Sequence, residues 1–237
     1  MRAYCDLHIH SCLSPCSDEM MTPNNIARMA LLKGLDAIAV TDHNSAKNLP
    51  ALEIACGRAG ILLLPGLELN TSEEVHLLAY FPTVKQALDF SEEIHPLLPP
   101  IPNRPDLFGE QLVMDGDDEV IAREDVLLIG ALSRTLGELA ERIGALGGAA
   151  VPAHVNRGSN GLLNALGFLP PDLPVAAVEV WRALPCPDLG GLMKLHSSDA
   201  HRLEDILERE IPFDIPELSV RALFDFIKKG NLHDHTL

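Results

Sequence analysis

Two histidines, His8 and His10, stand two residues apart near the start of the chain, within the apolar segment 5–10. Alternate residues of a β-strand point to the same face, so the two imidazoles would project side by side. Such a pair is typical of a metal site, although simple decoration of a strand remains an alternative. The pattern therefore needs support from other parts of the chain.

Further histidines and carboxylates follow, or lie within, the other apolar segments that we expect to be strands. Imidazole and carboxylate together are the ligand set that zinc, manganese and iron prefer. One such ion needs about four protein ligands. The sequence offers more than four, which predicts a site with several ions. These residues are His8, His10, Asp42, His43, Glu68, His76, His154, Asp199 and His201.

The strength of this evidence differs between residues. Glu68 stands in an apolar segment, where a buried carboxylate needs a partner and a metal ion is a good one. His154 would also fit as a core histidine with satisfied hydrogen bonds. Cys12 and Cys16 lie close to His10, but no second cysteine pair is present, so free thiols in a loop are preferred to a zinc knuckle.

The elements that must position these residues alternate between apolar, strand-like segments and helical patterns. This alternation indicates an α/β fold with a parallel sheet and helices outside. The strands are almost continuously apolar, as strands buried on both faces are, which favours a closed or distorted barrel. In such a barrel the active face lies at the carboxyl ends of the strands. The expected strands are 5–10, 36–43, 61–69, 74–81, 147–154, 175–181 and 195–201.

Helix signals are clearest at three places. Thr22 and Pro23 predict a helix start, with the helix ending near residue 34. Thr135 and Glu138 form a capping-box pattern for a helix that ends near residue 147. The last helix is expected over 216–230.

We expect a single domain over residues 1–237, with a loop-rich insertion around 96–122. The insertion lacks periodicity and is rich in proline, aspartate and glycine, which is typical of an excursion over an active face.

The composition of the chain limits its possible partners and its cellular location. The formal net charge of −16 disfavours binding to long nucleic acid. No apolar run approaches the ~20 residues that span a bilayer. Five sparse cysteines favour the cytoplasm.

Six short segments together resemble the PHP (polymerase and histidinol phosphatase) superfamily of metal-dependent phosphoesterases. The resemblance covers nearly the whole chain and is weakest in the insertion. It implies a distorted (β/α)7, TIM-like barrel with the metal site at the carboxyl ends of the strands. It also implies a trinuclear metal centre. From the ligand types we predict two to three bound divalent ions, which would be zinc, manganese or iron. The segments, in order, are "DLHIHS", "AVTDHN", "GLELNT", "VHLLAYF", "VPAHV" and "SSDAH".

The resemblance assigns ligands residue by residue. One ion would be held by His8, His10, Glu68 and Asp199, and Glu68 would bridge to a second ion held by His76 and His154. A third ion would be held by Asp18, His43 and His201. The segment around Asp18 departs from the pattern of the family, and Glu19 is the alternative ligand there.

The expected activity is hydrolysis of a small phosphorylated metabolite or nucleotide by a hydroxide that bridges the metal ions. Glu68 and Asp199 would support catalysis, and Arg157 would clamp the phosphate, with Arg182 as the second candidate. Two alternatives stay open: an exonuclease or oligonucleotide phosphodiesterase, and a catalytically inactive metal-binding regulatory barrel. The sequence leaves the substrate, the native metal and the oligomeric state open.

Overall fold

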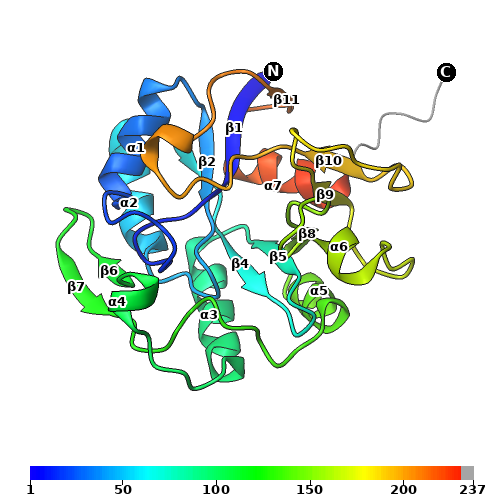
Figure 1. Ribbon diagram of the computed structural model, residues 1–237. Coiled ribbons are helices and arrows are strands. Elements are labelled where there is room, and N and C mark those ends of the chain that lie inside the picture. Colours follow the sequence, from blue (N-terminus) through cyan, green and yellow to red (C-terminus); the bar gives the residue numbers. More distant parts are fainter. Residues whose placement is uncertain (231–237) are drawn as a thin grey trace.

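The computed structural model describes residues 1–230 as a mixed α/β fold in which helices surround short strands (Figure 1). The longer helices are α1 (Pro23–Leu32), α2 (Leu49–Ala59), α3 (Val84–Ile94), α5 (Leu136–Ala145) and α7 (Val220–Lys229). Two short helices are α4 (Pro105–Phe108) and α6 (Leu162–Leu166). Single 3-10 turns lie at His95–Leu97 and Leu203–Asp205. None of these helices is long and apolar enough to cross a membrane.

Four small sheets contain all the strands in the described residues. They are ordered β11-β1-β2-β3, β10-β9, β4-β5-β8 and β6-β7. The strands are β1 (Arg2–Ile9), β2 (Ala37–Val40), β3 (Leu62–Leu63), β4 (Gly66–Asn70), β5 (His76–Tyr80), β6 (Leu112–Met114), β7 (Val120–Arg123), β8 (Ala149–Pro152), β9 (Ala177–Glu179), β10 (Met193–Leu195) and β11 (Pro212–Asp214).

The α/β class was predicted, but the closed barrel of parallel strands is not confirmed by these pairings. β1, β2 and β3 are parallel neighbours, as are β9 and β10. By contrast, β5 runs antiparallel to both β4 and β8. Only residues 71–75 separate β4 from β5, and this is too short for the crossover that parallel strands need. The expected strand 61–69 is also divided, because Pro65 follows β3 and supplies no backbone donor.

The three helix signals identify real helices. The Thr22 side chain accepts a hydrogen bond from the Asn25 amide at the start of α1, and Pro23 is the first helical residue. Thr135 and Glu138 form both hydrogen bonds of a capping box at α5. The last helix begins later than expected, at Val220, because the Ser219 side chain caps the amide of Ala222.

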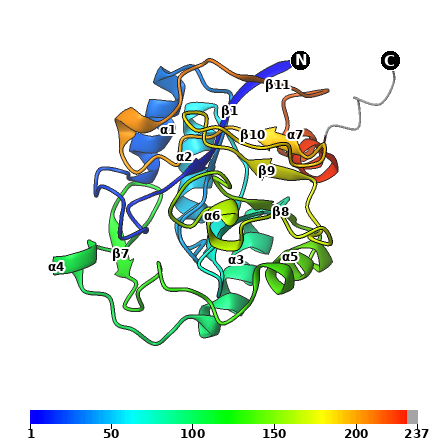
Figure 2. The ribbon, with the colours of Figure 1, turned by 45° about the vertical axis from the view of Figure 1, so that its right-hand side comes forward.

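The segment expected as a loop-rich insertion contains the antiparallel β6–β7 hairpin, which lies at the edge of the molecule in both ribbon views (Figures 1 and 2). Leu112 and Met114 are buried against Cys12. The Asp118 carboxylate, in the turn of the hairpin, accepts hydrogen bonds from the Thr22 hydroxyl at 2.6 Å and the Asn24 amide at 3.1 Å. The hairpin is therefore fastened to the start of α1.

Candidate metal centre

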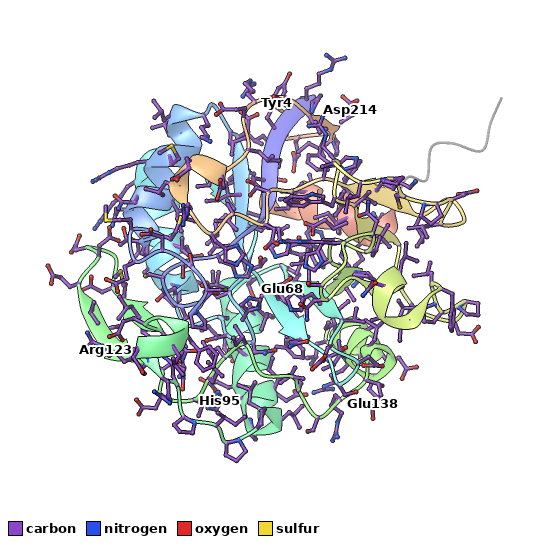
Figure 3. All side chains as sticks on the ribbon, viewed as in Figure 1. Tyr4, Glu68, His95, Arg123, Glu138 and Asp214 are labelled. Carbon is purple, nitrogen blue, oxygen red and sulfur yellow. The ribbon has the colours of Figure 1, made fainter. Side chains whose placement is uncertain are left out.

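Glu68, on β4, lies near the centre of the molecule (Figure 3) and is fully buried among histidines. Five imidazole nitrogens lie within 2.8–3.4 Å of its carboxylate oxygens. Despite this proximity, neither oxygen has a hydrogen-bond partner within residues 1–230, because the nitrogens approach without the required alignment. A buried carboxylate without hydrogen bonds is costly, whereas a shared metal ion would satisfy it. The five nitrogens belong to His8, His10, His43, His76 and His154.

The first strand delivers His8 and His10 to this point as its alternation predicts. Their Nε2 atoms lie 3.2 Å apart and both face Glu68. Asp199 approaches from the other end of the chain, with Oδ1 at 3.3 Å from His8 Nε2 and 3.2 Å from His10 Nε2. A single bridge between Ile9 and Ala200 brings the two segments together. Two imidazole nitrogens and two carboxylates therefore converge on one buried point.

Three histidines have their Nδ1 atoms engaged away from the cluster. His8 Nδ1 is 3.0 Å from Glu179, His10 Nδ1 is 3.0 Å from the Ser14 hydroxyl, and His201 Nδ1 is 2.8 Å from the Asp199 carbonyl. Such bonds fix the ring and its tautomer, so that Nε2 is left free to ligate. This arrangement is typical of metal-binding histidines rather than of histidines that merely fill a core.

Two backbone positions support the same interpretation. His154 and Asp199 have positive φ angles of 28° and 54°, in a region that non-glycine residues rarely occupy. Strain of this kind persists where the surrounding structure holds a side chain in a required direction. Both residues lie just beyond strand ends, as the sequence predicts for an active face.

The charges within the cluster shift several pKa values. Burial alone would raise the pKa of Glu68, but the nearby imidazoles of His76 and His8 hold it well below its usual range. Burial lowers the pKa of His10, yet the nearby carboxylates of Asp199 and Glu68 outweigh it and raise the value to about 9. Burial and the charge of His10 lower the pKa of His201 to about 4. Without ions, the cluster thus has ionised carboxylates and mixed imidazole charges.

The residues that could hold metal ions fall into three groups with mutually close ligand atoms. They are His8, His10 and Glu68; His43, Glu68 and His76; and His10, His43 and His201. Every predicted ligand except Asp18 either belongs to these groups or contacts their members.

Asp18 is exposed, and its carboxylate accepts a hydrogen bond from the Met20 amide of its own loop. The structure therefore does not bring Asp18 to the cluster; Glu19 is also exposed, and Cys16 lies at the cavity instead.

One buried carboxylate was missed. Glu179, at the end of β9, accepts a hydrogen bond from the backbone amide of His154 at 2.9 Å as well as contacting His8. It stands in the apolar segment 175–181, which is the signal that identified Glu68. Asp42 belongs to none of the three groups of candidate ligands, and its carboxylate accepts hydrogen bonds from the hydroxyls of Ser11 and Ser14.

Several members of the cluster, namely His43, Glu68, His76, His154, Asp199 and His201, line a cavity of about 300 Å³, the central cavity. The segment 96–122 contributes no residue to its wall. Arg157 also lines the central cavity. Its Nη1 donates to Asp199 Oδ2 at 2.5 Å, and its side chain is 43% exposed, which leaves its other N–H groups available to a ligand. Arg182 does not line the central cavity and pairs with Glu210 at 3.2 Å.

Comparisons with known proteins agree with this geometry. The family model of the PHP domain matches residues 6–120, which confirms the resemblance. A 5'-3' exoribonuclease of Haemophilus influenzae is 33% identical over 69 residues, which are 29% of this chain and 24% of that protein. The chain thus spans about a quarter of this curated relative.

Two solved structures share the fold. The lesion-specific endonuclease PfuEndoQ from Pyrococcus furiosus matches with a TM-score of 0.67 at 21% identity, over 96% of this chain and 56% of that one. A complex of Endonuclease Q with a 27-mer duplex that carries an abasic lesion matches with a TM-score of 0.64 at 20% identity, over 96% and 57%.

These relatives correct the expectation of a small substrate and of no long nucleic acid, which was wrong. They are named as nucleases, and one is bound to a 27-mer duplex. The net charge of −16 misled because it sums the whole surface. Binding depends on the local field, and Arg157 contributes a positive charge to the wall of the central cavity.

Proposed function

We propose that this chain, whose residues 6–120 match the family model of the PHP domain, is a metal-dependent phosphodiesterase that shortens nucleic acid strands from an end. The observation that carries the proposal is the fully buried Glu68, whose two oxygens face five imidazole nitrogens and lack hydrogen bonds. The nuclease names of the relatives support the substrate class. The small volume of the central cavity supports action on a strand end.

We infer that two to three divalent ions (zinc, manganese or iron) are held here. Glu68 would be shared between ions, since it contacts both His8 and His76. Asp199 would add a ligand through Oδ1, because Oδ2 is occupied by Arg157. The remaining ligands would be His10, His43, His154 and His201. Bound ions would supply an activated water and neutralise charge on the phosphate.

Other residues of the chain would orient the phosphate and the histidine ligands. Arg157 is fixed by Asp199 at one N–H, so its free N–H groups can hold a phosphate oxygen in a set plane. Glu179 and Ser14 would keep His8 and His10 oriented. Phosphoryl transfer needs little more than such positioning and electrostatic stabilisation.

We further propose that the strands form a distorted barrel. Backbone hydrogen bonds join the separate sheets where their strands end: Asn44 to Glu68, Val155 to Glu179, and His10 to Ala200, at 2.7–2.9 Å. These links support a ring of strands around the cluster, with the candidate ligands at one end of it.

The test is hydrolysis of short RNA and DNA labelled at either end, with Mn²⁺ or Zn²⁺ added to the purified chain. We expect products that shorten stepwise, loss of activity with a chelator, and recovery with metal. His10→Ala should abolish hydrolysis. His196→Ala is the matched control, because His196 bonds to the Val180 carbonyl and belongs to none of the three ligand groups. Stoichiometric metal binding without hydrolysis of any oligonucleotide would refute the proposal and favour the regulatory barrel.

A further inference from the structure

A second cavity of about 500 Å³, the side cavity, adjoins the central cavity. The two share Arg157, Asp199 and His201 in their walls. A chain-like ligand with one group at the metal cluster therefore has a direct path into the side cavity. Its volume lies within the ~300–1,000 Å³ typical of small-ligand sites.

The only tryptophan of the chain, Trp181, lines the side cavity. Its ring is partly exposed, and the Arg157 guanidinium lies over it with Cζ 5.0 Å from the ring centroid. A partly exposed indole that lines a cavity offers a planar apolar face on which a planar aromatic ligand can stack. Nucleobases stack on such rings irrespective of their identity.

The loop that carries this ring is held in place before any ligand arrives. The Asn156 side chain accepts a hydrogen bond from the Trp181 amide at 2.8 Å and donates to the carbonyls of Trp181 and Leu184, both at 3.0 Å. Asn156 lies two residues after His154, so the same turn positions a candidate ligand and the ring. Preorganisation of this kind lowers the entropic cost of binding.

The polar groups of the side cavity suit a nucleotide. The hydroxyl of Ser197 is buried and has no hydrogen-bond partner in the part of the chain that the structure describes, so it is available to a base edge or a sugar. Arg182 lies at the same wall, and its ion-pair partner among residues 1–230 is the exposed Glu210. A cation beside an aromatic ring is the combination that single-stranded nucleic acid binders use.

We propose that the side cavity is a nucleotide subsite in which a base stacks on Trp181 while the adjoining phosphodiester lies at the candidate metal centre. This inference rests on the proposed function and makes it more specific. Arg157 then has two roles, since it contacts both the indole and Asp199 and so joins the two cavities. Trp181 is a positioning residue for the strand and does not touch the reacting atoms.

The test uses the fluorescence of Trp181, which has no competing tryptophan. The probe is a four-nucleotide RNA with phosphorothioate linkages, which slow hydrolysis, and it is compared with an abasic strand of equal length and charge. In the metal-loaded protein we expect quenching by the first probe and little by the second. Equal responses to both probes, or no response to either, would overturn the proposal.

Variants give a second, independent readout by competition binding of the same probes. Trp181→Ala should weaken binding of the base-containing strand about tenfold and leave the abasic strand unchanged. Trp181→Phe should retain most of the affinity, and thermal unfolding reports whether each variant is folded. Phe168→Ala is the matched control, because Phe168 is an exposed aromatic that lines a different cavity. Wild-type affinity in folded Trp181→Ala would refute the subsite, even where hydrolysis itself is observed. Conversely, absence of hydrolysis with base-dependent quenching would refute only the proposed function.

Discussion

Glu179→Gln isolates the contribution of a carboxylate that supports a candidate ligand without facing the cavity. Oε2 of Glu179 lies 3.0 Å from His8 Nδ1 and 2.9 Å from the His154 amide, while Oε1 lies 3.1 Å from the same Nδ1. Glutamine presents only one acceptor oxygen. If that oxygen replaces Oε2, the new NH₂ group opposes the proton on His8 Nδ1; the reverse orientation loses the His154 contact instead.

Either orientation leaves His8 less firmly oriented and a weaker electron donor. Loss of such a supporting carboxylate typically weakens metal affinity 10–100-fold, or about 1.4–2.7 kcal/mol. The assay is competition between the protein and a chelator of known affinity for Zn²⁺ or Mn²⁺, combined with thermal unfolding without metal. Glu124→Gln is the control, since Glu124 is a buried carboxylate that pairs with Lys47 and contacts no candidate ligand. If the affinities of Glu179→Gln and wild type agree within twofold, the reasoning about His8 is refuted.

Four further predictions test other parts of the structure. Glu68→Gln should fold yet lose activity and metal, and wild-type metal stoichiometry in that variant would exclude Glu68 as a ligand. Arg157→Ala should lower kcat/KM about 10²-fold at unchanged metal content, with Arg157→Lys recovering only part; equal values for all three proteins would leave Arg157 without a role in catalysis. Asp118→Asn should lower the free energy of unfolding by about 1.5 kcal/mol with kcat/KM unchanged, because it weakens the attachment of the hairpin to α1. Metal at 100-fold its Kd should raise the free energy of unfolding by about 2.7 kcal/mol per site, and an unfolding temperature indifferent to a chelator would contradict metal binding in the folded state.

Local rules identified most of the elements that position the site. The alternation of His8 and His10 on a strand, and the caps of α1 and α5, depend on neighbours in the sequence. The pairing of β5 was missed because apolar strands look alike whether their neighbours run parallel or antiparallel. Only the connection 71–75 distinguishes the two cases, because it is too short for a crossover between parallel strands.

The sequence likewise identified some residues of the candidate site and missed others. Those at strand ends were found because a polar group after an apolar segment is conspicuous. Asp18 was placed by a family pattern that its loop does not follow, and in the structure that loop directs Cys16 toward the cavity. Glu179 was overlooked because its partner, His8, lies 171 residues away, and no local pattern links the two. The net charge of the chain gave a wrong prediction about nucleic acid, because a substrate responds to the local electric field at its binding site.

The bridge between β1 and the segment after β10 sets the order in which the site can be completed. The Ser198 hydroxyl donates to the His8 carbonyl across 190 positions of sequence, and Asp199 follows directly. Contacts so distant in sequence close late in folding, because a long loop must first be ordered. During synthesis, His8 and His10 emerge long before Asp199, so an ion captured early would lack one carboxylate. Firm metal retention would thus report that the polypeptide has been made through residue 201 and has folded.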